Sequence, residues 1–545
     1  MSNNIVRGTM LLTGAAFLSK FLGLIYLIPF NAMVGTTGGT LYGFAYTPYS
    51  IFLSLSTVGI PAAVSKFVSK YNSLDDYQTG MRIFKVGSIL MLGTGIAAFL
   101  VMFFSADVLA NWSISNEDSK GITSGDVAFA IRMVSIALII IPAMSIMRGF
   151  FQGHESMGPT ALSQIVEQIV RIAFILIGSY IILNWLDGSI VTAVGFSTFA
   201  AFIGAVASCI VLAVYWKKRK PYLQRQLDTQ RKTSTYKPTK KLLGELLSYA
   251  GPFVIVGLAI PLYQVVDQFT FERAMVASGR ADIWEDAYAG VNVYGHKIVI
   301  IPMTIAIGMS LSMLPTLTKS FTQNNHSLMT KQINQALQII LVFVIPASVG
   351  MVILSYEAYG TLYGLKHIDI TGSLLAWYAP VALLFALVNV TSAILQGINQ
   401  QNYAVISLLA GLLVKILLNI QLIHTFGAKG AIFGTALASG IAVALNLYRI
   451  KRATGFKFKQ TIKRTLLIGM FIIIMVLVIL LLKAGVGWIF PYKDSRVGVT
   501  IMLFIGVVGG AGVYLWLAYA STLLERIFNG PVPIIDRFLS RISRR

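Results

Sequence analysis

The chain has 545 residues, of which 56% are hydrophobic and only 12% are charged, and its mean hydropathy is +0.75. Soluble domains carry about 25% charged residues, so the composition excludes a large soluble enzyme and indicates a membrane protein with many spans. The formal net charge of +22 would suggest nucleic acid in a soluble chain, but the cytoplasmic loops of membrane proteins gather Lys and Arg for topological reasons.

No cofactor is expected from the residue types that usually hold one. Cys209 is the single cysteine, which excludes a disulfide framework and a cysteine-based metal cluster. The five histidines lack zinc-binding spacing, and the sequence has no phosphate-binding loop motif of an ATP-driven pump. We therefore expect neither a metal nor a nucleotide.

Apolar runs of about 20 residues are long enough to cross a bilayer as helices. The first run is too long for a signal peptide and lacks a small-x-small cleavage site, so we expect it to be retained. Fourteen runs are predicted as spans, at approximately 9–34, 44–66, 86–106, 127–147, 159–184, 189–216, 246–270, 288–316, 332–355, 371–397, 403–425, 430–448, 465–486 and 497–520.

The segments between these spans differ in charge. With the N-terminus inside, most of the 43 Lys and Arg residues fall in inner segments, above all 217–241 and 449–464. The outer loops carry most of the acids, including Glu117, Asp118 and Glu285. This asymmetry predicts both termini in the cytoplasm and accounts for the net charge without nucleic acid. The basic segments are also suited to contact anionic membrane lipids.

Two internal sequence similarities relate the two halves of the chain. The spacing of Pro48 and Pro61 in the second span recurs at Pro302 and Pro315 in the eighth. The stretch FQGHESMGPTALSQIVEQIVRI is echoed by LQGINQQNYAVISLLAGLLVKI. The first half contains six spans, an even number, so both halves enter the membrane from the same side. This predicts parallel repeats with a substrate cavity between two lobes.

The repeat predicts a division of the chain into five parts. They are an N-lobe at 1–216 (spans 1–6), a basic cytoplasmic linker at 217–245, a C-lobe at 246–450 (spans 7–12), spans 13 and 14 at 451–520, and a basic cytoplasmic tail at 521–545.

Ionisable residues inside spans are costly and are therefore functional candidates. Lys20 lies near the predicted midplane of the first span, and Arg171 and Lys415 occupy equivalent depths in spans 5 and 11. Glu167 precedes Arg171 by one helical turn, so these two are expected to pair. A cationic interior suits an anionic substrate, because lysine and arginine bind phosphate groups well. Arg171, Glu167 and Lys415 could equally hold helices together.

Several stretches carry a family resemblance: RGTMLLTGAAFLSKFLGLIYLIPF, LSTVGIPAAVSKFVSKYN, LYQVVDQFTFERAM and SMLPTLTKSF. Together with the span pattern, they resemble the multidrug/oligosaccharidyl-lipid/polysaccharide exporter superfamily over essentially the whole chain. More closely, the chain is similar to its MurJ branch of lipid II flippases, in the YtgP/SpoVB-like form. The resemblance implies an all-α, MATE-like fold of about 14 transmembrane helices in the bacterial plasma membrane. It also implies an electropositive central cavity and a lipid-tail groove made by spans 13 and 14.

The resemblance also implies a substrate site. Lys20 and Tyr26 stand where the family carries two arginines in span 1, and Lys297 stands where it carries another in span 8. In this reading Lys20 and Lys297 hold the pyrophosphate of an undecaprenyl-linked peptidoglycan precursor. Lys66 would admit it at the inner mouth and Arg273 would release it at the outer mouth.

Flipping by alternating access needs no covalent chemistry, so we expect a transporter and not an enzyme. Na⁺ or H⁺ coupling, or the membrane potential, is the energy source that the family implies, and Asp267 is the first carboxylate to consider for coupling. Cell-wall synthesis proteins are the expected protein partners.

Four alternatives remain open at this point. One is a flippase for another undecaprenyl-pyrophosphate-linked polysaccharide or a spore-cortex precursor. A cation-coupled drug exporter shares the fold, although deep carboxylates are sparse. A lipid-linked glycosyltransferase would need paired acids beside a basic loop, which the sequence lacks. A purely structural partner of the wall-synthesis machinery predicts that the buried lysines are dispensable.

Overall fold

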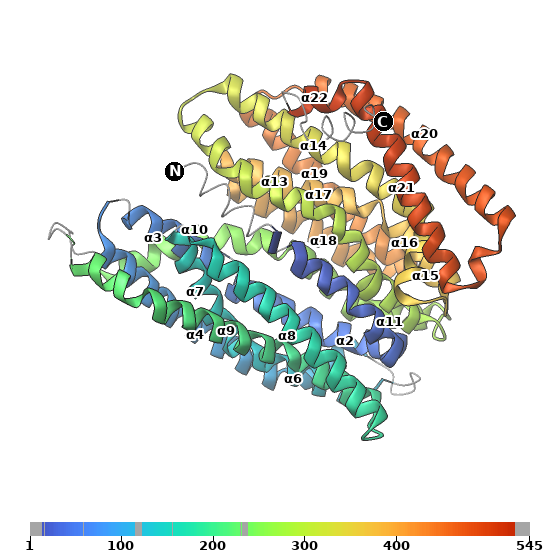
Figure 1. Ribbon diagram of the computed structural model, residues 1–545, viewed down its shortest axis with the longest axis horizontal. Coiled ribbons are helices and arrows are strands. Elements are labelled where there is room, and N and C mark those ends of the chain that lie inside the picture. Colours follow the sequence, from blue (N-terminus) through green and yellow to red (C-terminus); the bar gives the residue numbers. More distant parts are fainter. Residues whose placement is uncertain are drawn as a thin grey trace, which may run out of the picture. The chain divides into compact units, whose positions relative to one another are not determined.

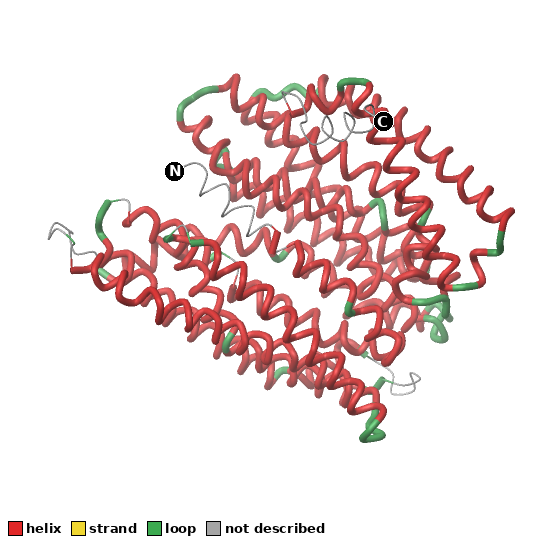
Figure 2. Tube along the Cα trace, viewed as in Figure 1, coloured by secondary structure: helices red, strands yellow, loops and turns green. Residues whose placement is uncertain are grey.

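The computed structural model describes residues 14–15, 17–57, 59–72, 74–114, 122–154, 156–228, 230 and 238–528. Every regular element in these ranges is a helix, and short turns join them (Figure 2). The predicted start of the first span, the acids at 117 and 118, and most of the tail at 521–545 lie outside the described residues.

The described chain divides into two compact units. Unit 1 comprises Met1–Val293 and Asn419–Gly427, and unit 2 comprises Tyr294–Leu418 and Ala428–Arg545. The boundary at 293 lies within a π-helical stretch, η2 (Ala289–Gly295), and not in the basic segment that follows the sixth predicted span. The five-part division based on the repeat stays a prediction.

Unit 1 begins with the helical segment Phe17–Ile25, here named the N-terminal helix. The elements that follow are α2 (Leu27–Thr57), α3 (Ile60–Asn72), α4 (Tyr77–Phe104), α5 (Ala106–Ser113), α6 (Ser124–Ser135), η1 (Ile136–Ile139), α7 (Ile141–Gly153), α8 (Met157–Asn184), α9 (Ile190–Asp228), α10 (Thr239–Gly257), α11 (Ala259–Ala277) and α12 (Trp284–Tyr288). Within the unit, α8 packs along α9, and α3 packs on both α4 and α7 (Figure 1). The core around α3 includes the buried side chains of Val64, Phe150 and Leu246.

Unit 2 contains the remaining helices, apart from the end of α18. They are α13 (His296–Thr322), α14 (His326–Ile353), α15 (Ser355–Tyr363), α16 (Ile368–Tyr378), α17 (Val381–Gly397), α18 (Gln401–Phe426), α19 (Ala428–Thr454), α20 (Lys459–Ile489), η3 (Tyr492–Asp494), α21 (Arg496–Ala520) and α22 (Leu523–Phe528). The last long helices, α20 and α21, lie side by side, as the red ribbons of Figure 1 show. They share an apolar core with α14 and α22.

Ten helices of the described chain are long and apolar enough to cross a membrane. They coincide with the predicted spans 3–6 and 9–14. An eleventh is obtained if the N-terminal helix and Leu27–Leu55, which are bent by 48° against each other, count as one span. The second and seventh predicted spans fall on broken helices, at Gly59 between α2 and α3 and at Leu258 between α10 and α11. The eighth predicted span falls on η2 and α13.

The first two predicted spans are divided at Gly35. This residue interrupts α2 with φ 65° and ψ −167°, where two helices meet across a kink. Such dihedral angles are accessible almost only to glycine. The first predicted span ends at Val34, directly before the kink. The helix that contains the start of the second predicted span already begins at the kink, before residue 44.

The repeat seen in the sequence has a packing counterpart in each unit. In unit 1, Gly153 ends α7, and a Cβ there would lie 2.8 Å from the Ser65 carbonyl oxygen of α3. In unit 2, Gly397 ends α17, and a Cβ there would lie 2.8 Å from Leu317 Cδ2 of α13. Both glycines therefore allow close contact with the helix that carries the second proline of each pair, Pro61 in α3 and Pro315 in α13.

Candidate functional site

The N-terminal helix packs on α8 through one face. Ser19 Oγ donates to the Gln164 carbonyl oxygen (3.5 Å), and a Cβ at Gly23 would lie 3.3 Å from Gln168 Nε2. Ser19 and Gly23 are one turn apart and so share a face, as do the two glutamines. Lys20 points off this face and is exposed. The serine and glycine of the SKFLG motif thus make the helix contact, while its lysine remains accessible.

Tyr26 lies at the bend between the N-terminal helix and α2, and its side chain is buried. Its hydroxyl lies 3.3 Å from that of Tyr42, which also accepts a hydrogen bond from Arg171 Nη2 at 3.3 Å. The Arg171 guanidinium lies 5.4 Å from the centroid of the Tyr46 ring, a cation–π arrangement. Tyr42 and Tyr46 are one turn apart on α2, and their rings stack 5.4 Å apart. The structure therefore brings two predicted residues, Tyr26 and Arg171, into one tyrosine-lined cluster.

The expected Glu167–Arg171 pair is wrong. Glu167 instead forms an ion pair with Arg148 of α7, whose Nη2 donates to Glu167 Oε2 at 2.7 Å. Arg148 also donates to Ser163 Oγ through Nε (2.9 Å) and to Ser208 Oγ through Nη2 (2.8 Å). Since these partners lie on α8 and α9, Arg148 connects three helices. Although Glu167 and Arg171 share a helix face, their side chains extend to different neighbouring helices.

Lys66 and Arg273, the predicted mouth residues, are both exposed in unit 1. Lys66 lies on α3, one residue after the Ser65 carbonyl that Gly153 approaches. Arg273 lies near the end of α11 and donates to the Asn111 carbonyl oxygen at 3.2 Å. Both cations are accessible to an anionic group.

Asp267, the predicted coupling carboxylate, is buried on α11 with 3% of its surface exposed. Its Oδ1 accepts a hydrogen bond from Asn419 Nδ2 at 3.0 Å, and the same amide donates to Thr270 Oγ1 at 2.8 Å. A buried carboxylate with amide contacts is suited to a change of protonation or to binding a small cation.

Unit 2 holds the other two predicted cations. Lys297 is half-buried at the start of α13, next to His296, whose Nδ1 lies 2.8 Å from the Tyr378 hydroxyl. Lys415 is completely buried on α18 and donates to Thr435 Oγ1 of α19 at 2.6 Å. This hydrogen bond and the burial favour a structural role for Lys415.

The sequence did not predict the contacts that two carboxylates, Glu357 and Glu285, make in the structure. Glu357 is fully buried and lies 2.8 Å from Lys483 Nζ, a cation that the hydropathy pattern places inside span 13. Glu285, predicted as an outer-loop acid, accepts from Thr37 Oγ1 at 2.9 Å, and burial raises the pKa of this carboxyl above its ordinary value. Lys483, a lysine inside an apolar run, was a sequence signal for the contact with Glu357. No local sequence feature indicates the contact between Glu285 and Thr37.

The candidate residues are thus divided unequally between the two units. Unit 1 contains the accessible cations of the N-terminal helix, α3 and α11, together with the tyrosine-lined arginine and the buried Asp267. Unit 2 contains Lys297 and the buried Lys415. Among the described residues, no group of three or more His, Cys, Asp or Glu side chains could hold a metal ion. The chemistry offered is the binding of anionic groups by lysine and arginine.

Comparisons with known proteins show the family and the fold of the chain. Residues 5–321 match the family described as "Polysaccharide biosynthesis protein". The chain belongs to this family. A curated relative from Bacillus subtilis (strain 168), "Lipid II flippase MurJ", is 44% identical over 535 residues, covering 98% of each chain. The "Stage V sporulation protein B" of the same organism is 24% identical, over 98% of this chain and 99% of the relative.

Solved structures of this family's fold superpose over most of the chain. "Lipid II flippase MurJ, inward closed conformation" has a TM-score of 0.64 at 17% identity, covering 95% of this chain and 99% of the other. An inward-facing multidrug resistance MATE transporter of the MOP superfamily has a TM-score of 0.60 at 14% identity, covering 82% and 96%. The protein is therefore an all-α, MATE-like membrane protein, as the sequence predicted.

Proposed function

We propose that this protein is a lipid II flippase, which moves an undecaprenyl-pyrophosphate-linked peptidoglycan precursor from the inner to the outer leaflet of the cell membrane. The observation that carries the proposal is the 44% identity to the Bacillus subtilis lipid II flippase, which extends over 98% of both chains. An identity of this size over the whole length includes both units. The protein is a transporter, and no covalent step is part of its function.

The pyrophosphate is the part of such a substrate that the accessible cations can recognise. Lys20 is exposed on the N-terminal helix, and Lys297 is half-buried at the start of α13. In the proposal, these two lysines bind the pyrophosphate as point charges. Lys66 and Arg273, both exposed, assist entry and release. Tyr26 contributes by supporting the bend that ends the N-terminal helix.

Orientation and energy source complete the proposal. Both termini lie in the cytoplasm, because the basic segments concentrate on that side. Alternating access is driven by Na⁺ or H⁺ coupling or by the membrane potential, and Asp267 is the proposed coupling carboxylate. Its burial and its contact with Asn419 support this role.

The proposal is tested by complementation of a bacterium depleted of its lipid II flippase. The chain is expressed as wild type, as Lys20→Ala and as Lys20→Arg, and membrane levels are measured beside growth. Rescue by wild type and Lys20→Arg, but not by Lys20→Ala, is expected if Lys20 is a counter-ion for the head group. Rescue by all three variants would keep the flippase and remove Lys20 from the site.

Failure of all variants, with the protein present in the membrane, would contradict the proposal. In that case another undecaprenyl-linked glycan is the next substrate to test. The 24% identity to the stage V sporulation protein B specifically favours a spore-cortex precursor as that second candidate. Protection from organic cations in a drug-efflux assay would instead point to a drug exporter.

A further inference from the structure

A basic cavity lies in unit 2, and none of its lining residues belongs to the proposed transport site. It has a volume of about 300 Å³, which is at the lower end of the range of ligand pockets. The lining comes from α14, the turn before α20, the start of α20, and α22. The lining residues are Ser327, Thr330, Lys331, Asn334, Gln335, Gln338, Phe456, Lys457, Gln460, Arg464, Arg526 and Ile527.

The charge of this cavity is of one sign. Four of its lining residues are Lys or Arg, and none is Asp or Glu. In the described part of the chain, no salt bridge neutralises Lys331, Lys457, Arg464 or Arg526. Arg526 is close enough to repel Arg464 electrostatically. Like charges held together in this way favour the binding of an anion between them.

Amide side chains hold part of the lining in place. Arg464 Nη1 donates to Gln338 Oε1, and Gln338 Nε2 donates to Asn334 Oδ1 at 2.7 Å. Asn334 Nδ2 in turn donates to Gln460 Oε1 at 2.9 Å, which connects α14 to α20. Gln338 is buried, with 1% of its surface exposed. The guanidinium of Arg464 is therefore positioned by a hydrogen-bonded chain before any ligand arrives.

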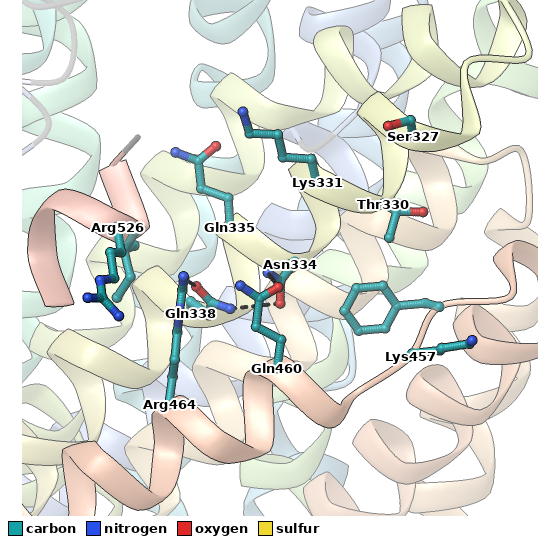
Figure 3. Close-up of a pocket in the computed structure, with 12 residues that line it drawn as sticks. Ser327, Thr330, Lys331, Asn334, Gln335, Gln338, Lys457, Gln460, Arg464 and Arg526 are labelled. Atoms are coloured by element: carbon teal, nitrogen blue, oxygen red, sulfur yellow. Dashed lines mark hydrogen bonds between the residues drawn. The ribbon is translucent and has the colours of Figure 1, made fainter. Parts of the chain in front are cut away.

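Two long helices also begin at the cavity. Ser327 and Thr330 belong to the first turns of α14, which has 28 residues, and Gln460 belongs to the first turn of α20, which has 31. The first backbone N–H groups of a helix and its dipole favour an anion. Phe458, the residue before α20, provides no side-chain cap for these groups. Figure 3 shows the head groups of Arg464 and Arg526 on one side of the cavity, Lys331 above them, and Lys457 on the opposite side.

We propose that this cavity binds a phosphate-bearing anion. The cations, the preordered Arg464 and the start of α20, which has no side-chain cap, together provide hydrogen-bond donors for a phosphate group, whereas Asn325 already caps the start of α14. A membrane phospholipid head group and a soluble phosphate share this chemistry. The cavity is formed by segments predicted to lie on the cytoplasmic side, where both sources are present.

The test uses the purified full-length protein in a neutral detergent at fixed ionic strength. Its Tm is measured during titration with inorganic phosphate, with short-chain phosphatidylglycerol, and with phosphatidylcholine as the net-neutral comparison. The double variant Lys331→Gln/Arg526→Gln removes two exposed cations of the cavity. The matched control, Lys451→Gln/Lys463→Gln, removes two exposed cations that do not line it.

We expect phosphate or phosphatidylglycerol to raise the Tm of the wild type, and the cavity variant to need about tenfold more ligand, which corresponds to the loss of one to two charge-assisted contacts. The control variant is expected to titrate like the wild type. A response to phosphatidylglycerol alone assigns a lipid head group, and a response to inorganic phosphate as well shows that the phosphate group suffices. Absence of any shift, or an equal loss in both double variants, overturns the proposal. Because the assay contains no transport step, its result is independent of flippase activity.

Discussion

Arg148 and Glu167 form an ion pair of 2.7 Å between α7 and α8, in which 16% and 20% of the two side chains are exposed. The unit contains a second arginine–carboxylate pair, Arg132 with Asp107, whose side chains are 39% and 61% exposed. The two pairs have the same chemistry but different environments. Because solvent screens exposed charges, only the first pair is expected to contribute strongly to stability.

Replacement of Glu167 by Ala leaves the Arg148 guanidinium without its counter-ion. Breaking a buried pair costs about 3 kcal/mol, and the partial exposure here reduces that cost to about 2 kcal/mol. We expect a clear decrease of the Tm of the purified protein in detergent. Asp107→Ala is the matched control and should cost less than about 1 kcal/mol. Equal effects of the two substitutions would contradict the assignment of Arg148 as the residue that connects three helices.

Gly149 allows α7 to approach α3. A Cβ at this position would lie 2.4 Å from the Pro61 carbonyl oxygen, a distance that real contacts do not reach. Gly149→Ala should therefore separate the helices and lower the Tm. Gly178→Ala on α8 is the control, since no atom lies within 4 Å of its Cβ and alanine is the better helix former by about 1 kcal/mol. An unchanged Tm for Gly149→Ala would mean that the two helices can repack.

Lys483 is the counter-ion of the fully buried Glu357 in unit 2. Lys483→Met leaves a buried carboxylate without a cation, at a cost of about 3 kcal/mol. The double variant Lys483→Met/Glu357→Gln removes both charges and should recover most of the lost stability. Comparison of the Tm values of the single and double variants measures this coupling. A double variant as unstable as Lys483→Met would show that the loss comes from packing and not from charge.

Glu285 provides a pH-dependent test. Burial raises the pKa of its carboxyl above the ordinary value of 4.5, against the opposing effect of the Thr37 hydrogen bond. The folded state therefore holds the proton more tightly than the unfolded state does. The resulting stabilisation is complete below pH 4.5 and is lost as the pH rises through the raised pKa.

Glu285→Gln cannot ionise but still accepts from Thr37. We expect equal Tm values for variant and wild type near pH 4, and a variant more stable by about 1 °C near pH 7.5. Asp282→Asn, at an exposed position before α12, serves as the control. A difference that is the same at both pH values would exclude ionisation of Glu285 as its cause.

The sequence predicted the all-helical fold and most of its spans because long apolar runs have few alternatives in a membrane. It also named Tyr26 and Arg171 as candidate residues, although it could not show that the side chains of Tyr42 and Tyr46 on α2 contact Arg171 of α8. Arg148 directly follows the fourth predicted span, and its local sequence does not mark it as a residue that connects helices. Its role depends on Ser208, sixty residues away on α9. Such partners are set by helix packing, which local spacing does not encode.

The kink at Gly35 has a consequence for the handedness of the chain. Its dihedral angles, φ 65° and ψ −167°, are the mirror image of the polyproline II conformation that ordinary L-residues adopt. The backbone at this position would therefore suit a D-amino acid, whereas an L-alanine would be strained even though no atom lies within 4 Å of its Cβ. At this residue glycine serves as the achiral substitute for a D-residue that ribosomal synthesis does not provide.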